Sequence, residues 1–405
     1  MLDINKRNMI IVTIIAFAFY QFINFIYFPI ATTFPDEQRF LTEAITFANT
    51  GEFWIGNNRA WEMPLTAIVY GSIYKIANNI EYTIILIRIM QSLMLILQAF
   101  LIYKISLIIF KKSKVAFLSF IIMLFYPFFI YYQALLLSET LFTTILILSF
   151  YFMYKWYESG FIINKYFILT NVFLTFTIYS KGTLSILPPL LISIFYLLNT
   201  YNIKIFIKYF IYSILIYILI MSVWWLRNYY IFDKFIAFTT SSSMNLYLGA
   251  NKNNKFGGIN GRTNMEPEFR KRMNSLNNEL RKSDEYKKRA LEFILNNKDR
   301  YVELMWLKFK RFYSFTFNAD RYNKVYYNLL SIFSYGLVFI FALTTVILMI
   351  KEWKKMSAIY ILILYFTLIH ILYIASIRYR FPIEHFLILL GAYSMIELNK
   401  IFKKK

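Results

Sequence analysis

The sequence contains no cysteine and only two histidines, His370 and His385. The lack of cysteine excludes disulfide bonds, thiol nucleophiles and cysteine-based zinc or iron sites, and two histidines leave little room for a histidine-rich metal site. The sequence also lacks a P-loop, an HExxH motif and a GxSxG motif. Nucleotide hydrolysis and the hydrolytic chemistries that depend on these motifs are therefore set aside.

Charged residues are scarce as well, at 16% of the 405 residues, whereas 59% are hydrophobic and 21% are aromatic. A soluble protein of this size needs more polar residues to cover its surface. The apolar residues also occur in runs of about twenty, the length that crosses the hydrocarbon core of a bilayer. We therefore predict an all-α polytopic membrane protein.

Ten apolar runs are interpreted as membrane spans. The first, Met9 to Ile30, follows Lys6 and Arg7 and is too long for the apolar core of a signal peptide, so we expect it to remain as an anchor. Pro64–Ala77 has 14 residues, too few to span, and is predicted to be an interfacial or re-entrant helix. The other nine spans are expected at about residues 83–109, 115–132, 136–154, 166–181, 183–199, 208–226, 326–350, 356–374 and 381–398.

The net charge of +22 does not form one patch, so nucleic acid is not an expected partner. Lys and Arg in short loops mark the cytoplasmic side, and here they occupy every second loop. This predicts a multi-pass protein of the bacterial cytoplasmic (inner) membrane with both termini in the cytoplasm. The outer side then receives residues 31–82, the turns near 133 and 182, residues 227–325 and residues 376–380.

Three regions follow from this topology. Residues 1–226 form an N-terminal transmembrane region whose first outer loop (31–82) carries an acidic pair. Residues 227–325 form an extracytoplasmic segment, with 20 Lys and Arg against 10 Asp and Glu, because long loops cross largely regardless of charge. Its Ser/Asn/Gly-rich first third predicts irregular backbone, and Glu266–Phe317 predicts helices. Residues 326–405 hold the last helices, the outer loop 376–380 and a basic cytoplasmic tail.

Asp36 and Glu37 follow the first span directly, after Pro35. The ordinary interpretation is a solvated loop or a helix cap, which the dipeptide alone favours. The alternative is a general base at the depth of a lipid phosphate. Glu139 lies near the outer end of a span, where a carboxylate is costly unless it faces a cavity or a cation. Arg88, also among apolar residues, is interpreted as a snorkelling or structurally paired charge.

Arg378 and Arg380 lie on the five-residue outer loop 376–380, where arginine is ordinarily rare. The planar guanidinium matches phosphate oxygens with two hydrogen bonds and keeps its proton, which suits it to hold a phosphate. The structural alternative is pairing with Glu139 or Glu384. Lys181, at an outer turn, is either a cation facing a cavity or an interfacial anchor.

These features in combination resemble the GT-C membrane glycosyltransferases, in particular the bacterial protein mannosyltransferase and lipid A aminoarabinose transferase group. The resemblance extends over the whole chain in order and spacing, with departures at Val223 and Glu384-His385. It is carried by the acidic pair at 36–37, Ser138-Glu139, WWLRN at 224–228, NLYLGAN at 245–251 and RYRFP at 378–382.

The resemblance implies inverting transfer of a sugar from a polyprenyl-phosphate carrier to a lipid, glycan or protein acceptor at an outward-facing site, with no cofactor and no metal. In this interpretation Asp36 is the base and Glu37 orients the acceptor or its neighbours. The remaining roles are phosphate binding by Arg378 and Arg380, weaker help from Lys181 and Arg227, and lining of the cavity by Glu139 and Tyr379.

Two other functions fit parts of the sequence. A lipid-linked glycan polymerase or ligase also combines about ten spans with a large outer segment. A transporter would be expected to show paired broken helices and internal symmetry, and neither is visible. The transferase hypothesis makes one spatial prediction: the carboxylate after the first span and the guanidinium groups near the end of the chain lie in one pocket.

Overall fold

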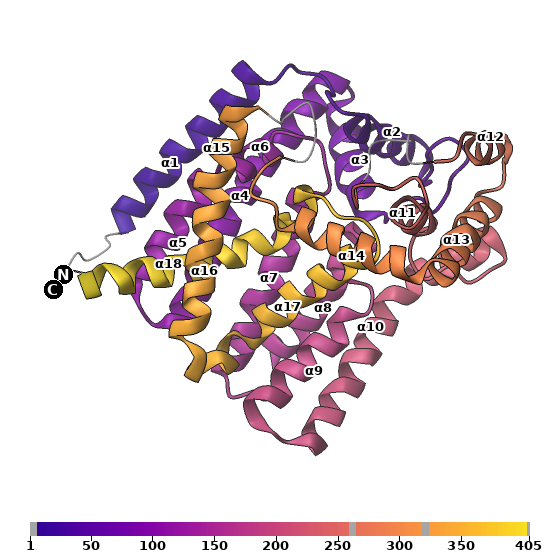
Figure 1. The fold of residues 1–405 in the computed structure, drawn as a ribbon. Helices are drawn as coiled ribbons and strands as arrows, with labels where there is room; N and C mark the ends of the chain where they lie inside the picture. The colour runs from indigo at the N-terminus through magenta and orange to yellow at the C-terminus, as the bar shows by residue number, and fades with distance from the viewer. Residues whose placement is uncertain (1–5, 259–264, 318–323, 403–405) are drawn as a thin grey trace.

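The computed structural model describes residues 6–258, 265–317 and 324–402 (Figure 1). These residues are helical and contain no β-strand, only an isolated bridge between Ile55 and Asn58. The helices up to the outer segment are α1 (Lys6–Phe22, continued by the π-helical turn η1, Ile23–Tyr27), α2 (Pro35–Thr50), α3 (Leu65–Ala77), α4 (Ile80–Phe110), α5 (Ser113–Phe125), α6 (Pro127–Gln133), α7 (Glu139–Glu158), α8 (Lys165–Ser180), η2 (Gly182–Leu184), α9 (Leu187–Thr200) and α10 (Ile203–Phe232).

The remaining helices form the outer segment and the C-terminal region. The outer segment contains α11 (Ser241–Gly249), α12 (Pro267–Ser275), α13 (Glu279–Asn296) and α14 (Lys298–Phe312). The C-terminal region contains α15 (Val325–Ser331), η5 (Ile332–Gly336), α16 (Leu337–Leu348), η6 (Ile350–Met356), α17 (Ser357–Leu372), η7 (Ile377–Arg380) and α18 (Phe381–Phe402). The basic residues Lys403 to Lys405 lie outside the described residues.

Local signals account for many helix ends. Asn79, Asn164, Asn202 and Asn278 each accept a hydrogen bond from a backbone N–H in the first turn of the following helix, as N-cap residues do. Pro127 has no N–H to donate, and the chain bends by 50° between α5 and α6 at this point.

The fold confirms a multi-pass membrane protein. Within the described residues, six helical stretches are long and apolar enough to span a membrane, and the bent pair α5–α6 makes a seventh. The runs predicted at 136–154, 166–181 and 183–199 are helical as α7, α8 and α9, but they are not among these six or seven. The number of ten crossings therefore stays a prediction.

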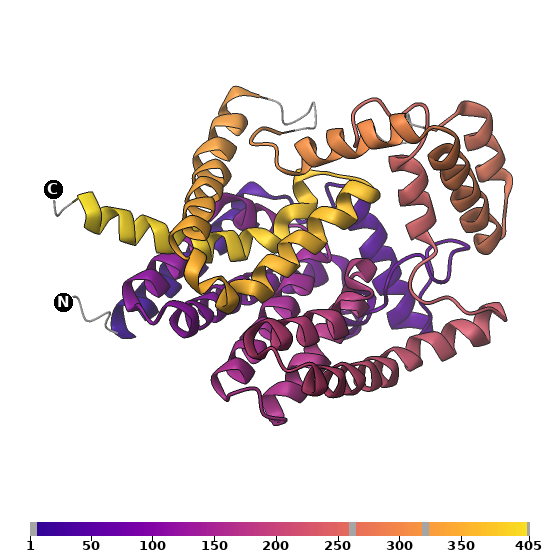
Figure 2. The same cartoon turned by 60° about the horizontal axis from the view of Figure 1, so that its bottom comes forward.

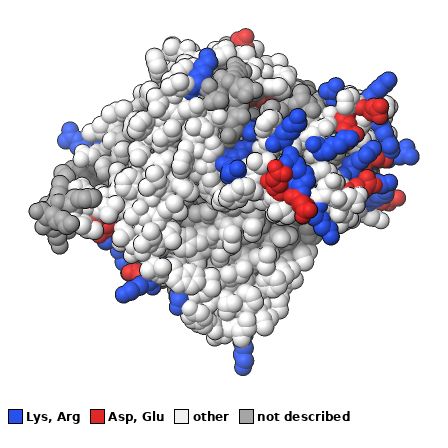
Figure 3. Space-filling model, viewed as in Figure 1, with Lys and Arg blue, Asp and Glu red and all other residues white. Residues whose placement is uncertain are grey.

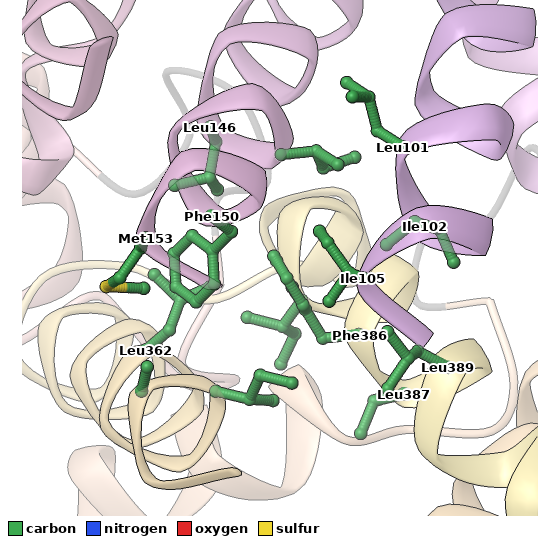
Figure 4. Close-up of a cluster of buried hydrophobic side chains, with 14 of the residues drawn as sticks. Leu101, Ile102, Ile105, Leu146, Phe150, Met153, Leu362, Phe386, Leu387 and Leu389 are labelled. Atoms are coloured by element: carbon green, nitrogen blue, oxygen red, sulfur yellow. The ribbon is translucent and has the colours of Figure 1, made fainter. Parts of the chain in front are cut away.

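The core lies where α4, α7, α17 and α18 meet. Figure 4 shows side chains from these four helices packed together, including Ile105, Phe150, Leu362 and Phe386, each fully buried. Small residues let the helices approach closely: a Cβ on Gly391 of α18 would lie 3.1 Å from the carbonyl oxygen of Val338 on α16. By contrast, α1, α10 and α16 expose many apolar side chains, which fits helices that face lipid.

The first outer loop folds into α2 and α3, which pack against each other. Gly71 makes this possible, because a Cβ there would lie 2.6 Å from the carbonyl oxygen of Ala44. The predicted helix at Pro64–Ala77 is thus confirmed as α3, and its interfacial position stays a prediction.

The outer segment differs from the sequence prediction in two places. Helix α10 does not end at residue 226 but continues to Phe232 and stops where Asp233 adopts a left-handed conformation, with φ at 52°. Residues 241–249, predicted to be irregular, form α11, because Tyr247 and Leu248 pack with Phe269 and Tyr286 of α12 and α13. Burial against neighbouring helices outweighs the weak helix propensity of its serines.

The surface charge distribution separates the two ends of the molecule (Figure 3). In this view charged side chains gather over α12, α13 and α14, and others lie along the opposite edge. The face between them is nearly free of charge, as expected for a surface in contact with lipid.

Candidate active site

Asp36 is joined to the other end of the chain. It stands at the second position of α2, after Pro35, and its Oδ2 accepts a hydrogen bond from Nη1 of Arg378 at 2.6 Å. Its Oδ1 lies 3.3 Å from Nη1 of Arg39, one turn further along α2. The two partners Asp36 and Arg378 are 342 positions apart, so the structure brings together one of the two predicted guanidinium groups and the carboxylate.

Glu139 is the second carboxylate that pairs with Arg378. It begins α7, and its side chain is only 2% exposed. Its Oε1 accepts from Nε of Arg378 at 2.6 Å and from Nζ of Lys181 at 3.2 Å. Arg378 thus uses the two sides of its guanidinium to bridge Asp36 and Glu139, as this planar group is suited to do. We call Asp36, Glu139, Lys181 and Arg378 the ion cluster.

Tyr379 borders the ion cluster. Its ring is parallel to that of His370, with 4.7 Å between centroids, and Nζ of Lys181 lies 5.5 Å from the Tyr379 ring centroid. Lys181 is therefore held between the Glu139 carboxylate and an aromatic face. The structure pairs Lys181 with Glu139, and the choice between a cation facing a cavity and an interfacial anchor stays a prediction.

The ion cluster sets the protonation of Asp36. Partial burial acts to raise its pKa, but the positive charges of Arg378 and Arg39 outweigh burial, so the pKa of Asp36 lies below its ordinary value. Asp36 is therefore ionised at neutral pH and is able to accept a proton.

Glu37 faces away from the ion cluster and is fully buried. Its Oε2 accepts from the backbone N–H groups of Thr33 and Phe34 at 2.9 and 3.0 Å, which closes the start of α2. Its Oε1 accepts from the N–H of Leu136 at 2.9 Å, in the loop that leads to Glu139. The helix-cap interpretation thus applies to Glu37, which fastens the start of α2 next to the start of α7.

Arg380 is not brought to the ion cluster. It is fully buried, its Nε donates to Glu384 at 2.6 Å, and its Nη1 donates to the carbonyl oxygens of Phe312 and Ser314. The guanidinium also lies over the Tyr335 ring. This is the structural pairing with Glu384 that the sequence left open. It engages Nε and Nη1 of the group that was predicted to bind phosphate, whereas the buried Nη2 has no hydrogen-bond partner among the described residues.

Arg227 also makes its contacts outside the ion cluster. Its Nη1 donates to the carbonyl oxygen of Arg59 at 2.7 Å and to Asn228 at 2.9 Å, and it stands over the Trp224 ring. It therefore ties the end of α10 to the first outer loop.

Arg88, interpreted from the sequence as structural, donates to the backbone carbonyl oxygens of Ala134, Asn24 and Ala31, which confirms that interpretation.

Sequence reasoning missed Arg39 and Glu62. Arg39 lies between Asp36 and Glu62, with Nη2 at 3.0 Å from Oε1 of Glu62. The signal for Arg39 is its position three residues after Asp36, where side chains on a helix meet. Glu62 comes from the loop before α3 and carries no such signal. Within the described residues, no group of three or more His, Asp or Glu side chains has an arrangement that could hold a metal ion.

Glu43, two turns after Asp36 on α2, was missed as well. It is 2% exposed, and its Oε2 has no hydrogen-bond partner among the described residues. Burial and the negative charge of Glu62 raise the pKa of Glu43 to about 8, against the opposing effect of Arg39 and Arg227. Glu43 is therefore mostly protonated at neutral pH.

This raised pKa predicts a pH-dependent stability. The folded state holds a proton on Glu43 that the unfolded state has already lost, so stability is full below the ordinary glutamate pKa and is lost as the pH rises through about 8. Glu43→Gln removes the cost of a buried charge. We expect its melting temperature in detergent to be close to that of the wild type at pH 5 and higher, on the order of 5 °C, at pH 9. Equal melting temperatures at pH 9 would show that Glu43 is not the titrating group.

Comparison with known proteins places the chain in a known fold. A sequence model of the family described as dolichyl-phosphate-mannose-protein mannosyltransferase matches residues 63–226, less than half of the chain. That stretch contains Glu139 and Lys181 and stops short of Asp36 and Arg378 on either side. No curated protein sequence matches the chain.

Solved structures extend the comparison to the whole chain. The archaeal oligosaccharyltransferase AglB from Archaeoglobus fulgidus, solved with an inhibitory peptide and a dolichol-phosphate, is similar with a TM-score of 0.53 and 12% identity. The match covers 98% of this chain and 50% of AglB, so this chain spans half the length of that protein. ArnT from Cupriavidus metallidurans bound to undecaprenyl phosphate has a TM-score of 0.49 and 11% identity, over 97% of this chain and 78% of ArnT.

The chain therefore has the fold of a GT-C membrane glycosyltransferase, as its sequence motifs suggested. Within that class, the family model that matches part of it is that of the dolichyl-phosphate-mannose-protein mannosyltransferases. The structural similarity establishes the architecture, and the chemistry is argued from the ion cluster.

Proposed function

We propose that the protein transfers a sugar from a polyprenyl-phosphate carrier to an acceptor at the outer face of the membrane, with inversion at the anomeric carbon. One observation carries the proposal: Arg378 bridges Asp36 and Glu139. A candidate base and a candidate phosphate-binding group thus lie within one hydrogen bond of each other. The family model that matches residues 63–226 and the lipid phosphate in the AglB structure support the choice of donor.

The reaction needs few groups because a phosphate is already a good leaving group. An acceptor hydroxyl or amine attacks the anomeric carbon, and its proton passes to the Asp36 carboxylate. The bond between the anomeric carbon and the phosphate oxygen breaks, and the lipid phosphate leaves with the electron pair. Arg378 and Lys181 then hold the charge that develops on the phosphate, which is the electrostatic part of catalysis.

The ion pairs that Asp36 makes before a donor binds make its pKa depend on donor binding. In the free protein, Arg378 helps to lower the pKa of Asp36. A donor phosphate next to Arg378 competes with Asp36 for Nη1, and the pKa of Asp36 then rises toward its ordinary value. Asp36 becomes a stronger base once the donor has bound, while Arg39 continues to hold its other oxygen.

Glu139 has a supporting part in this scheme. It holds Arg378 and Lys181 through the same oxygen, so that both cations stay in place without a donor. The ion cluster as a whole holds two cations and two carboxylates, so the donor phosphate gains the full charge of Arg378 only by displacing Asp36 from it. Glu37 acts through the position of α2, and Tyr379 borders Lys181.

The proposal includes the topology argued from the sequence: a bacterial cytoplasmic membrane, both termini in the cytoplasm, and residues 227–325 outside. The charged surface over α12–α14 supports an aqueous location for that segment (Figure 3). The acceptor is a lipid, a glycan or a protein.

A transfer assay tests the function. Purified protein in liposomes is supplied with a radiolabelled polyprenyl-phosphate sugar and candidate acceptors, and a second set of liposomes receives a polyprenyl-diphosphate oligosaccharide. Labelled product from the first donor supports the proposal. Product from the second donor alone would establish a glycan polymerase or ligase instead. Movement of either donor across the bilayer without product would establish a transporter.

A further inference from the structure

The segment before Arg378 is held by the outer segment of the protein. Residues 372–376 connect the end of α17 to η7, the short 3₁₀ turn that carries Arg378. The carbonyl groups at the end of a helix and in the connection that follows it have no partner within the helix, so they need other donors. The partners come from α14 and, for the carbonyl oxygen of Ile374, from Nδ1 of His370 on α17. Helices α11 and α14 lie next to the end of α17 in Figures 1 and 2.

Helix α14 holds two of these carbonyl groups. The hydroxyl of Tyr301 donates to the carbonyl oxygen of Leu372 at 2.9 Å, and Nζ of Lys308 donates to the same oxygen at 3.2 Å. Nε of Arg311 donates to the carbonyl oxygen of Ala375 at 3.1 Å. The three donors are spaced along α14, and together they fix both ends of the connection.

Helix α11 holds the middle of the connection. Gly249, its last residue, lies against the backbone of Tyr373 so closely that a Cβ would overlap the Tyr373 carbonyl oxygen. The next side chain, Ile374, is 3% exposed and packs in the cluster formed by Tyr247, Leu248 and residues of α12 and α13. Gly249 belongs to the NLYLGAN motif, to which the proposed chemistry gives no role.

We propose that α11 and α14 form a clamp on residues 372–376, and that Gly249 is a positioning residue that sets where Arg378 stands. This inference rests on the proposed function for its catalytic consequence. Ser376 links the clamp to the site, because its Oγ accepts from the N–H of Arg378 at 3.3 Å at the start of η7. A shift of the connection therefore moves the backbone of Arg378 away from Asp36 and Glu139.

The expected effect follows from the geometry of a bridging arginine. Displacement by about 1 Å breaks the alignment of both of its ion pairs and can cost on the order of 100-fold in rate. Gly249→Ala should lower kcat/KM for the polyprenyl-phosphate donor by this amount and leave KM for the acceptor unchanged. Tyr301→Phe removes one hydroxyl without adding an atom and should lower donor kcat/KM in the same direction by about fivefold, the value of one hydrogen bond.

The matched control is Gly336→Ala in η5, where a Cβ would meet no atom closer than 3.9 Å. Three measurements are made on each purified full-length variant: binding of undecaprenyl phosphate, sugar transfer, and hydrogen exchange of the amides at 377–380. Gly249→Ala and Tyr301→Phe should both weaken binding and speed exchange, and Gly336→Ala should match the wild type in all three.

Binding and exchange do not require catalysis, so they separate this inference from the proposed function. Wild-type exchange rates and wild-type binding in both Gly249→Ala and Tyr301→Phe would overturn the clamp. Absence of transfer by the wild type, with faster exchange and weaker binding in the two variants, would overturn the proposed function and keep the clamp. Should Gly249→Ala fail to fold, Tyr301→Phe alone decides.

Discussion

Asp36→Asn is expected to abolish sugar transfer without lowering the amount of folded protein in the membrane. The amide has the shape of the carboxylate and can still accept a hydrogen bond from Arg378, but it cannot take the acceptor proton. Loss of a general base lowers kcat by about 10²- to 10⁴-fold. Because the neutral amide competes with the donor for Arg378 less strongly than the carboxylate does, its KM for the donor should not rise.

The measurement is steady-state transfer by purified protein at several donor concentrations, with membrane levels compared by quantitative blotting. Asp284→Asn is the matched control, since Asp284 is exposed on α13, far along the chain from the ion cluster. Transfer by Asp36→Asn at close to the wild-type rate would remove Asp36 from the role of base. A rise in donor KM with unchanged kcat would point to a role in binding instead.

Arg378→Ala is expected to lower kcat/KM for the lipid-linked donor on the order of 100-fold, as loss of a partly buried charge-assisted contact does. Among the described residues it also leaves the buried Glu139 with Lys181 as its one ion-pair partner, so some loss of folded protein is expected. Arg378→Lys keeps the charge but lacks the second arm of the guanidinium, and it should restore donor use only in part.

Arg380 provides the comparison that isolates this effect. Its charge is buried against Glu384, so Arg380→Ala should reduce the yield of folded protein, and the fraction that folds should keep its dependence on donor concentration. Donor titrations on the monodisperse fraction of each variant separate the two outcomes. An unchanged donor KM in Arg378→Ala, or equal losses in Arg378→Ala and Arg380→Ala, would show that the phosphate assignment is wrong.

The different roles of Arg378 and Arg380 show where sequence reasoning stopped. Both arginines match the same motif and carry the same chemistry, so nothing in the sequence separates them. In the structure they lie two positions apart on a 3₁₀ turn, where such residues point to different sides. One therefore reaches Asp36 and the other reaches Glu384.

The acidic pair divides in the same way. Adjacent residues on a helix point about 100° apart, so Asp36 and Glu37 could not both face Arg378. The sequence identified the pair but not which member meets the cation. Glu37, the member that caps the helix, is fully buried and accepts four hydrogen bonds from residues 33, 34 and 136.

The sequence by itself determined the properties that depend on residues close together along the chain. The length of apolar runs defines a multi-pass membrane protein, and capping asparagines and a proline account for several helix ends. The tertiary structure alone decided which charges pair, that residues 241–249 form α11, and how α11 and α14 contact residues 372–376. Most of these outcomes depend on distances between segments that are far apart along the chain, up to 342 positions for Asp36 and Arg378, and such distances are fixed only when the helices pack.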